Sequence, residues 1–401
     1  MDGIPHPPTP TPNYYVLYIL LSVQRSIVVQ QHLVVAWRHI NFCGMINNWL
    51  LFLLAHLFRS GDAFEVPFPP SAAEIRAAVR VSAPLPVTTR QLLLGSGTKA
   101  EVITCLPPSK SASAQSLLAQ IFGTPSSNRK ELHDKPVLAF LHGSFHASWC
   151  WQEKWMPHFA SLGYPCVAFS LQGTGGTPTV EYGAKTVRIG NHVRDLDAFL
   201  RGLSDNDSNC LGLELGENPR IALIGHSFGG LTIMKWLEQY YAEDNEDRNI
   251  DKLGVNLAGV SLLCSVPPSG NGKMTMRFLR RSFRDSWTIS AGFVMKKAIT
   301  DQAICRELFF GGSEDANGVT DEDVERYQSY FERDSAVIID LKDLSRQLPS
   351  AKLDKQSGKA PFADKLPSAL VIAASDDFIV DEEVSCTITQ TVRLNLFNAP
   401  H

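Results

Sequence analysis

The chain has 401 residues, of which 44% are apolar and 19% are charged, and its 37 basic and 41 acidic side chains leave a net charge of −4. This composition is typical of a folded hydrophobic core and excludes a disordered or collagen-like chain, and it offers no polybasic surface for a nucleic-acid partner. The eight cysteines form no C-x-x-C pair, so we expect free thiols, no metal and no cofactor.

Residues 1–65 differ in composition from the rest of the chain. Residues 1–61 contain one acidic residue, Asp2, and two apolar stretches at residues 14–23 and 42–58. Each stretch is near or below the ~17–25 apolar residues of a bilayer-crossing helix, and the Pro-rich start does not suit a secretory signal. Three interpretations stay open: a membrane anchor, a cleaved targeting segment, and a start that is not native to the protein.

This segment also decides what we expect of localisation. We predict membrane association or targeting to an organelle, with the chloroplast as one candidate, and the cytoplasm as the alternative. The Pro-rich beginning of residues 66–85 predicts a linker. The sequence gives no indication of an oligomeric state.

From about residue 86 onward, short apolar runs alternate with amphipathic stretches. Residues 86–94 and 100–106 nearly alternate apolar and polar side chains, which predicts an antiparallel hairpin. Continuous apolar runs, typical of strands buried on both faces, occupy residues 136–141, 164–171, 221–224, 257–264 and 369–374. Helices are predicted over residues 151–161, 187–203 and 229–241. The pattern predicts an α/β fold with a mostly parallel sheet flanked by helices.

One predicted strand, residues 221–224, leads directly into a G-x-S-x-G pattern at Gly225-His226-Ser227-Phe228-Gly229. A strand before this pattern and a helix after it are the setting of a nucleophile elbow, a sharp turn that lifts a serine clear of the sheet. Glycines on both sides of the serine avoid side-chain clashes in such a turn. We predict Ser227 as the nucleophile and the N–H of Phe228 as one oxyanion donor.

A second motif follows the predicted strand at residues 136–141, where the other oxyanion donor of such a site is expected. Gly143 would let the backbone turn close to the nucleophile, and we predict the N–H of Ser144 as the donor. We expect His142 to stabilise the turn and His146 to line a pocket, and we expect His226 to be a packing residue. None of the three histidines is predicted as the catalytic base.

Together with the stretch S-D-D-F-I-V at residues 375–380, these motifs resemble the α/β-hydrolase superfamily. The pattern H-G-x-x-x-x-x-W-x-W, which begins at His142, is similar to the plant esterase and hydroxynitrile lyase branch of that superfamily. The resemblance covers about residue 86 to the end of the chain. It implies an eight-stranded, mostly parallel sheet, a cap inserted after the sixth strand, and catalytic residues in the order serine, acid, histidine.

The acid should follow the predicted strand at residues 369–374, because α/β sites gather at the carboxyl ends of strands. Asp376 and Asp377 compete, and the resemblance favours Asp377 because the family's acid precedes a short apolar pair. His401, the last residue, is predicted as the base. The family continues there with a helix, so we expect a truncated C-terminus that impairs the position of His401.

Residues from about 267 to 348 interrupt the strand rhythm with helical patterns rich in methionine and aromatic residues, which predicts a helical cap. Thr320 and Asp323 have the spacing of a capping box and predict the start of a helix. Apolar side chains of the cap would form a pocket over Ser227 for a small or medium-sized ester. The predicted hydrolase domain therefore spans residues 86–401 and includes this cap.

These residues predict a serine hydrolase that cleaves carboxylic esters through a Ser-His-Asp triad and an acyl-enzyme. Two alternatives stay open: a hydroxynitrile-lyase-type activity that uses the same triad as a base, and a catalytically impaired protein that only binds ligands. Epoxide hydrolysis and dehalogenation need a carboxylate nucleophile, whereas the elbow of this chain carries Ser227.

Overall fold

The computed structural model describes residues 33–37, 85–108, 135–204, 211–213, 215, 218–241, 254–270, 283–310, 319–349, 354, 356 and 369–374. Within these ranges, no helix is long and apolar enough to cross a bilayer. The two apolar stretches at residues 14–23 and 42–58 lie outside the described residues, as does nearly all of the predicted linker.

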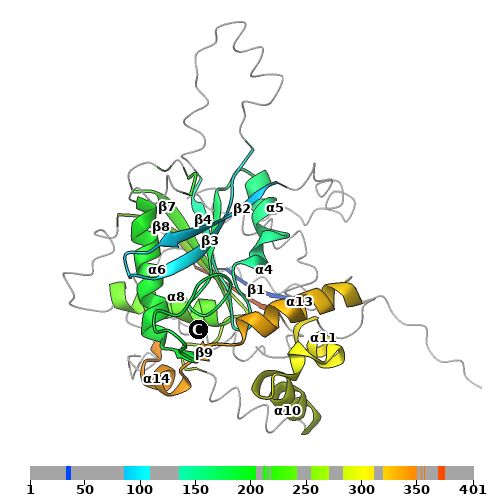
Figure 1. Cartoon of the computed structure of the whole chain (residues 1–401). Helices are drawn as coiled ribbons and strands as arrows, with labels where there is room; N and C mark the ends of the chain where they lie inside the picture. Colours follow the sequence, from blue (N-terminus) through cyan, green and yellow to red (C-terminus); the bar gives the residue numbers. More distant parts are fainter. Residues whose placement is uncertain are drawn as a thin grey trace, which may run out of the picture.

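An eight-stranded sheet forms the centre of the fold (Figure 1). Its strand order is β1-β10-β8-β7-β4-β5-β3-β2. The pairs β2–β3 and β3–β5 are antiparallel, and the other five neighbouring pairs are parallel. The strands are β1 (Leu33–Trp37), β2 (Val87–Leu93), β3 (Lys99–Cys105), β4 (Val137–Leu141), β5 (Cys166–Phe169), β7 (Arg220–His226), β8 (Asn256–Leu263) and β10 (Ala369–Ala374). The predicted mostly parallel α/β sheet and its five buried runs are confirmed.

The edge opposite β1 is the predicted hairpin. β2 and β3 pair from Val87 opposite Cys105 to Leu93 opposite Lys99. The turn closes with hydrogen bonds from Gly97 N–H to Leu94 O and from Leu94 N–H to Thr98 O, both 2.8 Å long. Gly97 adopts a φ of 87°, a conformation that glycine reaches without steric cost.

β1 was not predicted. It comes from the N-terminal segment, and its five residues pair in parallel with β10, from Leu33 opposite Leu370 to Trp37 opposite Ala374. The apolar run of this strand lies between polar residues and is too short to stand out from the sequence around it.

The sheet buries both faces, as the continuous apolar runs predicted. Alternate residues of β4 point to opposite faces, so Leu138 and Phe140 pack in one core with Trp151, whereas Val137 and Leu141 belong to the other core. Helices α4 (Trp149–Gln152) and α5 (Trp155–Ser161) cover the first face, and α6 (Ile189–Ser204) and α8 (Phe228–Tyr241) cover the second (Figure 1). Burial of one such large apolar side chain contributes about 1.5–3 kcal/mol.

The predicted helix at residues 151–161 is two helices. Pro157 explains the break, because its ring would clash with the carbonyl of Glu153 if one helix continued through that turn. The helix predicted at residues 187–203 begins at Ile189 instead, because Val187 belongs to β6 (Thr186–Val187), which pairs with β9 (Ile338–Ile339). The prediction of α8 was correct to within one residue.

Several helices lie in the stretch where the cap was predicted (Figure 1). They are α10 (Phe283–Ile289), a π-helical turn (Ser290–Val294), a 3-10 turn (Lys297–Ile299), α11 (Gln302–Phe310), α13 (Asp321–Asp334) and α14 (Leu341–Arg346). The capping box of α13 is confirmed: Asp323 N–H donates to Thr320 Oγ1 over 3.1 Å, and Thr320 N–H donates to Asp323 Oδ2 over 3.2 Å.

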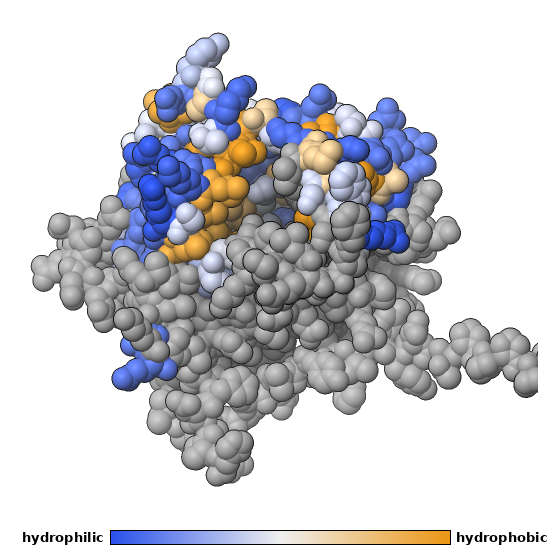
Figure 2. All heavy atoms as spheres, turned by 90° about the horizontal axis from the view of Figure 1, so that it is seen from below, coloured by the Kyte–Doolittle hydropathy of each residue, from blue (hydrophilic) through white to orange (hydrophobic). Residues whose placement is uncertain are grey.

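The surface of the described residues is mixed in polarity (Figure 2). On the face seen in Figure 2, apolar side chains form a strip between groups of hydrophilic residues. Two large apolar side chains of the predicted cap, Trp287 and Met295, are about half exposed.

Candidate active site

Ser227 occupies a sharp turn between β7 and α8. Its φ of 52° lies in the left-handed region, where a residue with a β-carbon is strained by about 1–2 kcal/mol. The turn is held by β8 and the segment after it: Ser227 N–H donates to Leu263 O over 3.0 Å, and Ser227 O accepts the N–H of Val266 over 3.1 Å. The side chain of Ser227 is half-buried. The serine therefore sits on a strained, fixed turn and is not enclosed in the core.

Three glycines let neighbouring backbones approach this turn. A β-carbon at Gly225 would lie 2.7 Å from the Cα of Gly230, and one at Gly229 would lie 2.5 Å from His142 O. A β-carbon at Gly143 would lie 2.8 Å from the Cβ of Ser227. Real β-carbons do not tolerate such separations. The neighbouring backbones can therefore pack this closely around Ser227 only because positions 143, 225 and 229 are glycines.

His142 is fixed in one tautomer. Its Nε2 accepts the N–H of Leu171 over 2.9 Å, so the ring proton lies on Nδ1, which donates to Gly143 O over 2.8 Å. Burial lowers the pKa of His142 to about 4. The neutral ring thereby orients the peptide between Gly143 and Ser144, since the carbonyl and the N–H of one peptide point in opposite directions. This is the turn-stabilising role predicted for His142.

The other histidines around Ser227 are neutral as well. Burial lowers the pKa of His146 and His226, and it lowers that of His192 to about 3. These rings therefore place no positive charge near Ser227 at neutral pH. Within the described ranges, no group of three or more His, Cys, Asp or Glu side chains could hold a metal ion.

His146 joins the loop after β4 to the predicted cap. Its Nδ1–H donates to Ser144 O over 2.8 Å, and its ring stacks on Trp149 with centroids 5.5 Å apart. Phe331 of α13 and Phe309 of α11 contact the same ring, at 5.2 and 5.9 Å. Aromatic side chains from two helices of the predicted cap thus converge on the loop that contacts Ser227.

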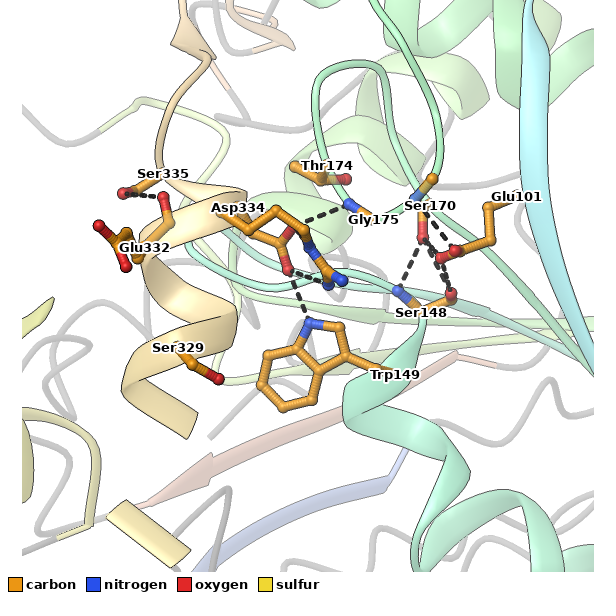
Figure 3. Close-up of polar contacts among 12 residues, drawn as sticks. Glu101, Ser148, Trp149, Ser170, Thr174, Gly175, Ser329, Glu332, Asp334 and Ser335 are labelled. Atoms are coloured by element: carbon orange, nitrogen blue, oxygen red, sulfur yellow. Dashed lines mark hydrogen bonds and ion pairs between the residues drawn. The ribbon is translucent and has the colours of Figure 1, made fainter. Parts of the chain in front are cut away.

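Two carboxylates that sequence analysis missed hold the loops around this site (Figure 3). Glu101 of β3 accepts the hydroxyl hydrogens of Ser148 and Ser170, over 3.0 and 2.8 Å. Asp334, at the end of α13, accepts the Nε1–H of Trp149 over 2.7 Å. Because the partners lie 47 to 185 positions apart in the chain, no local motif marks these carboxylates.

The structure places three of the five predicted site residues. Ser227 lies at the elbow, Phe228 follows it as the first residue of α8, and Ser144 is exposed in the loop that packs on Ser227. The N–H groups at the start of a helix have no partner within that helix, which suits the role predicted for Phe228. Asp377 and His401 lie outside the described residues.

Residues 138–395 match the model of the alpha/beta hydrolase family, which is more than half of the chain. A stretch of 112 residues is 29% identical to methylesterase 10 of Arabidopsis thaliana. This match covers 28% of the chain and 34% of that relative, so the chain spans about a third of the relative's length.

The chain is also similar to solved structures. It covers 86% of a hydrolase from Pseudomonas aeruginosa PA01 (12% identity, TM-score 0.43) and 87% of the esterase RhEst1 from Rhodococcus sp. ECU1013 (16% identity, TM-score 0.39). It covers 98% of epoxide hydrolase I of potato, Solanum tuberosum (15% identity, TM-score 0.41). Each likeness extends over 76% of the chain.

Proposed function

Because the chain belongs to the alpha/beta hydrolase family, we propose that it is a serine hydrolase that cleaves carboxylic esters. The observation that carries the proposal is the half-buried Ser227 at a φ of 52°, on a turn between a parallel strand and a helix. A turn of this kind supports the proposal, because a nucleophile elbow serves to present a serine hydroxyl to a carbonyl beside backbone N–H donors.

In the proposed reaction, Ser227 Oγ attacks the ester carbonyl and forms a bond to its carbon. The carbonyl oxygen becomes an oxyanion, which the N–H groups of Ser144 and Phe228 stabilise. His401 takes the proton from Ser227 and returns it to the departing alcohol, and Asp377 orients the imidazole. Water then attacks the acyl-enzyme by the same route and releases the acid.

For the substrate, we propose a small or medium-sized ester with an apolar part. The aromatic rings of His146, Phe309 and Phe331 meet beside the loop that packs on Ser227, which supports an apolar surface near the reacting group. The similarity to methylesterase 10 makes methyl esters of aromatic or aliphatic acids the first substrates to test.

Labelling with a fluorophosphonate and hydrolysis of an aryl ester test this proposal. The wild type should be labelled at Ser227 and release the phenol in a burst, because acylation precedes deacylation. Ser227→Ala should abolish both signals. Ser161→Ala is a matched control, because Ser161 donates only to the carbonyl of His158 at the end of α5. His401→Ala and Asp377→Asn should lower turnover if these residues complete the triad.

The same measurements separate the alternatives. Cyanohydrin cleavage without a burst would point to a lyase, since that reaction forms no acyl-enzyme. Ligand binding that survives Ser227→Ala, with no turnover in the wild type, would point to a binding protein. Absence of labelling at Ser227 in the folded wild type would contradict the serine-hydrolase proposal.

A further inference from the structure

We propose that Asp334 is a positioning residue that holds helix α13 against the loop carrying Ser144, an inference that rests on the function proposed above. Asp334 is the last residue of α13 and is 1% exposed. Its Oδ2 accepts the Nε1–H of Trp149, and its Oδ1 accepts the backbone N–H of Gly175, both over 2.7 Å (Figure 3). One carboxylate therefore joins three segments that are distant in the sequence.

The surroundings of this side chain require a carboxylate. Besides Trp149 and Gly175, the Nε–H of Arg333 donates to Oδ1 over 2.8 Å and an Nη2–H of Arg333 donates to Oδ2 over 2.9 Å. All four contacts are donors, and an ionised carboxylate only accepts. An amide at this position would turn an NH₂ group toward at least one of these N–H groups. The neighbouring guanidinium also offsets the cost of burying the charge.

The carboxylate is connected to the proposed oxyanion loop through Trp149. The indole that donates to Asp334 stacks on His146 at an interplanar angle of 16°, and His146 Nδ1–H donates to Ser144 O. Phe331, one turn before Asp334 on α13, contacts the rings of both His146 and Trp149, with centroids 5.2 and 6.0 Å apart. A shift of α13 would therefore move the groups that orient the Ser144 backbone.

A second carboxylate shows what loss of Asp334 would leave intact. Glu101 of β3 binds Ser148 in the same loop and the N–H of Gly176 in the loop after β5, both over 3.0 Å. Glu101 thus ties both loops to the sheet, whereas Asp334 ties them to α13. Removal of Asp334 should loosen the helix and the Ser144 loop without unfolding the sheet.

Three full-length variants test the inference. Asp334→Asn changes the carboxylate to an amide, and Trp149→Phe keeps an aromatic ring but removes the N–H that reaches Asp334. Glu332→Gln, an exposed neighbour on α13, is the matched control for the loss of one negative charge. Aryl ester kinetics, the rate of fluorophosphonate labelling and amide hydrogen exchange of residues 143–146 are compared among them.

We expect Asp334→Asn and Trp149→Phe each to lower kcat and the labelling rate by about tenfold, with KM within about threefold, because a displaced oxyanion donor weakens transition-state binding more than substrate binding. The double variant should be no more than about twofold slower than the slower single variant, since both changes break one contact. Exchange at residues 143–146 should rise in both single variants. Glu332→Gln should match the wild type in every measurement.

Wild-type kcat and wild-type exchange in folded Asp334→Asn would overturn the inference, as would losses that multiply in the double variant. If Asp334→Asn does not fold, Trp149→Phe decides alone by the same kcat and exchange criteria. A wild type that is not labelled at Ser227 refutes the proposed function instead, and hydrogen exchange still shows whether Asp334 holds the Ser144 loop.

Discussion

Gly143 and Ser227 are in direct contact, because a β-carbon at position 143 would lie 2.8 Å from the Cβ of Ser227 and 3.1 Å from Nδ1 of His226. The loop after β4 can therefore approach the elbow only while position 143 carries no side chain. The same loop continues into Ser144, the proposed oxyanion donor. The absence of one methyl group thus sets the distance between the proposed nucleophile and the loop that would stabilise its intermediate.

Gly143→Ala should accordingly lower both stability and turnover. The added methyl group must push the loop or the elbow away, which costs about 1–3 kcal/mol of unfolding free energy and moves Ser144 from its place. Gly190→Ala is the control, because its β-carbon would meet nothing nearer than 3.8 Å and alanine favours a helix by up to about 1 kcal/mol. Urea unfolding and ester kinetics measure the two effects, and equal values for Gly143→Ala and the wild type would refute the prediction.

The protonation state of His142 can be tested directly. Because Nε2 accepts the N–H of Leu171 and burial lowers the pKa of His142 to about 4, the ring should be neutral and protonated on Nδ1 at neutral pH. Nitrogen-15 NMR of the histidine rings can observe this state. His142→Phe should lose about 1–3 kcal/mol of stability, because it leaves the buried Leu171 N–H without its acceptor. A ring that carries its proton on Nε2, or a cation at neutral pH, would contradict the assignment.

Strands β4, β5, β7, β8 and β10 could be predicted because they are uninterrupted apolar runs, and β2 and β3 could be predicted because apolar and polar residues nearly alternate in them. The elbow could be predicted because its requirements are local: a strand, two glycines, a serine and a helix within a short stretch. The break before Pro157 was not predicted, although its cause is local as well, since proline forbids a helix from continuing through Glu153. Each of these features depends on residues that are close together in the chain.

The features that were missed depend on distant residues. β6 and β9 pair Thr186 with Ile338 in strands of two residues, which are too short to show a period. Asp334 meets Trp149 across 185 positions, and the sequence around it reads as the polar end of an amphipathic helix. Asp334 links α13 to Trp149 and Gly175 because it is buried between them, and this burial depends on the tertiary fold. The roles predicted for Asp377 and His401 stay predictions.

Stability should fall as the pH drops, because the buried histidines must remain neutral in the folded protein. Burial lowers the pKa of His192 from an ordinary 6.5 to about 3, so between these values the unfolded chain binds a proton that the folded chain does not. Stability is then fully present above about pH 6.5 and is lost progressively below it, by about 2 kcal/mol for His192 between pH 7 and pH 5.

His192→Phe isolates this contribution, because phenylalanine cannot be protonated and can keep an edge contact with Phe228, whose ring lies 5.9 Å from that of His192. Urea unfolding at both pH values should show a smaller decrease for the variant than for the wild type. The remaining decrease includes that of His142 and His146, which change in the same direction. An identical pH dependence of the two proteins would show that His192 is not held neutral by burial.

The capping box at the start of α13 should contribute to stability more than to activity. Thr320→Ala removes the hydroxyl that accepts Asp323 N–H and should cost about 1 kcal/mol of unfolding free energy. Ser329→Ala is the control within the same helix, because Ser329 is exposed and donates only to Arg326 O, and alanine there should change stability by no more than about 0.5 kcal/mol. Since α13 carries Phe331 and Asp334 at its other end, kcat should fall less in Thr320→Ala than in Asp334→Asn. A loss of activity in Thr320→Ala as large as in Asp334→Asn would show that the whole helix, and not the carboxylate, positions the site.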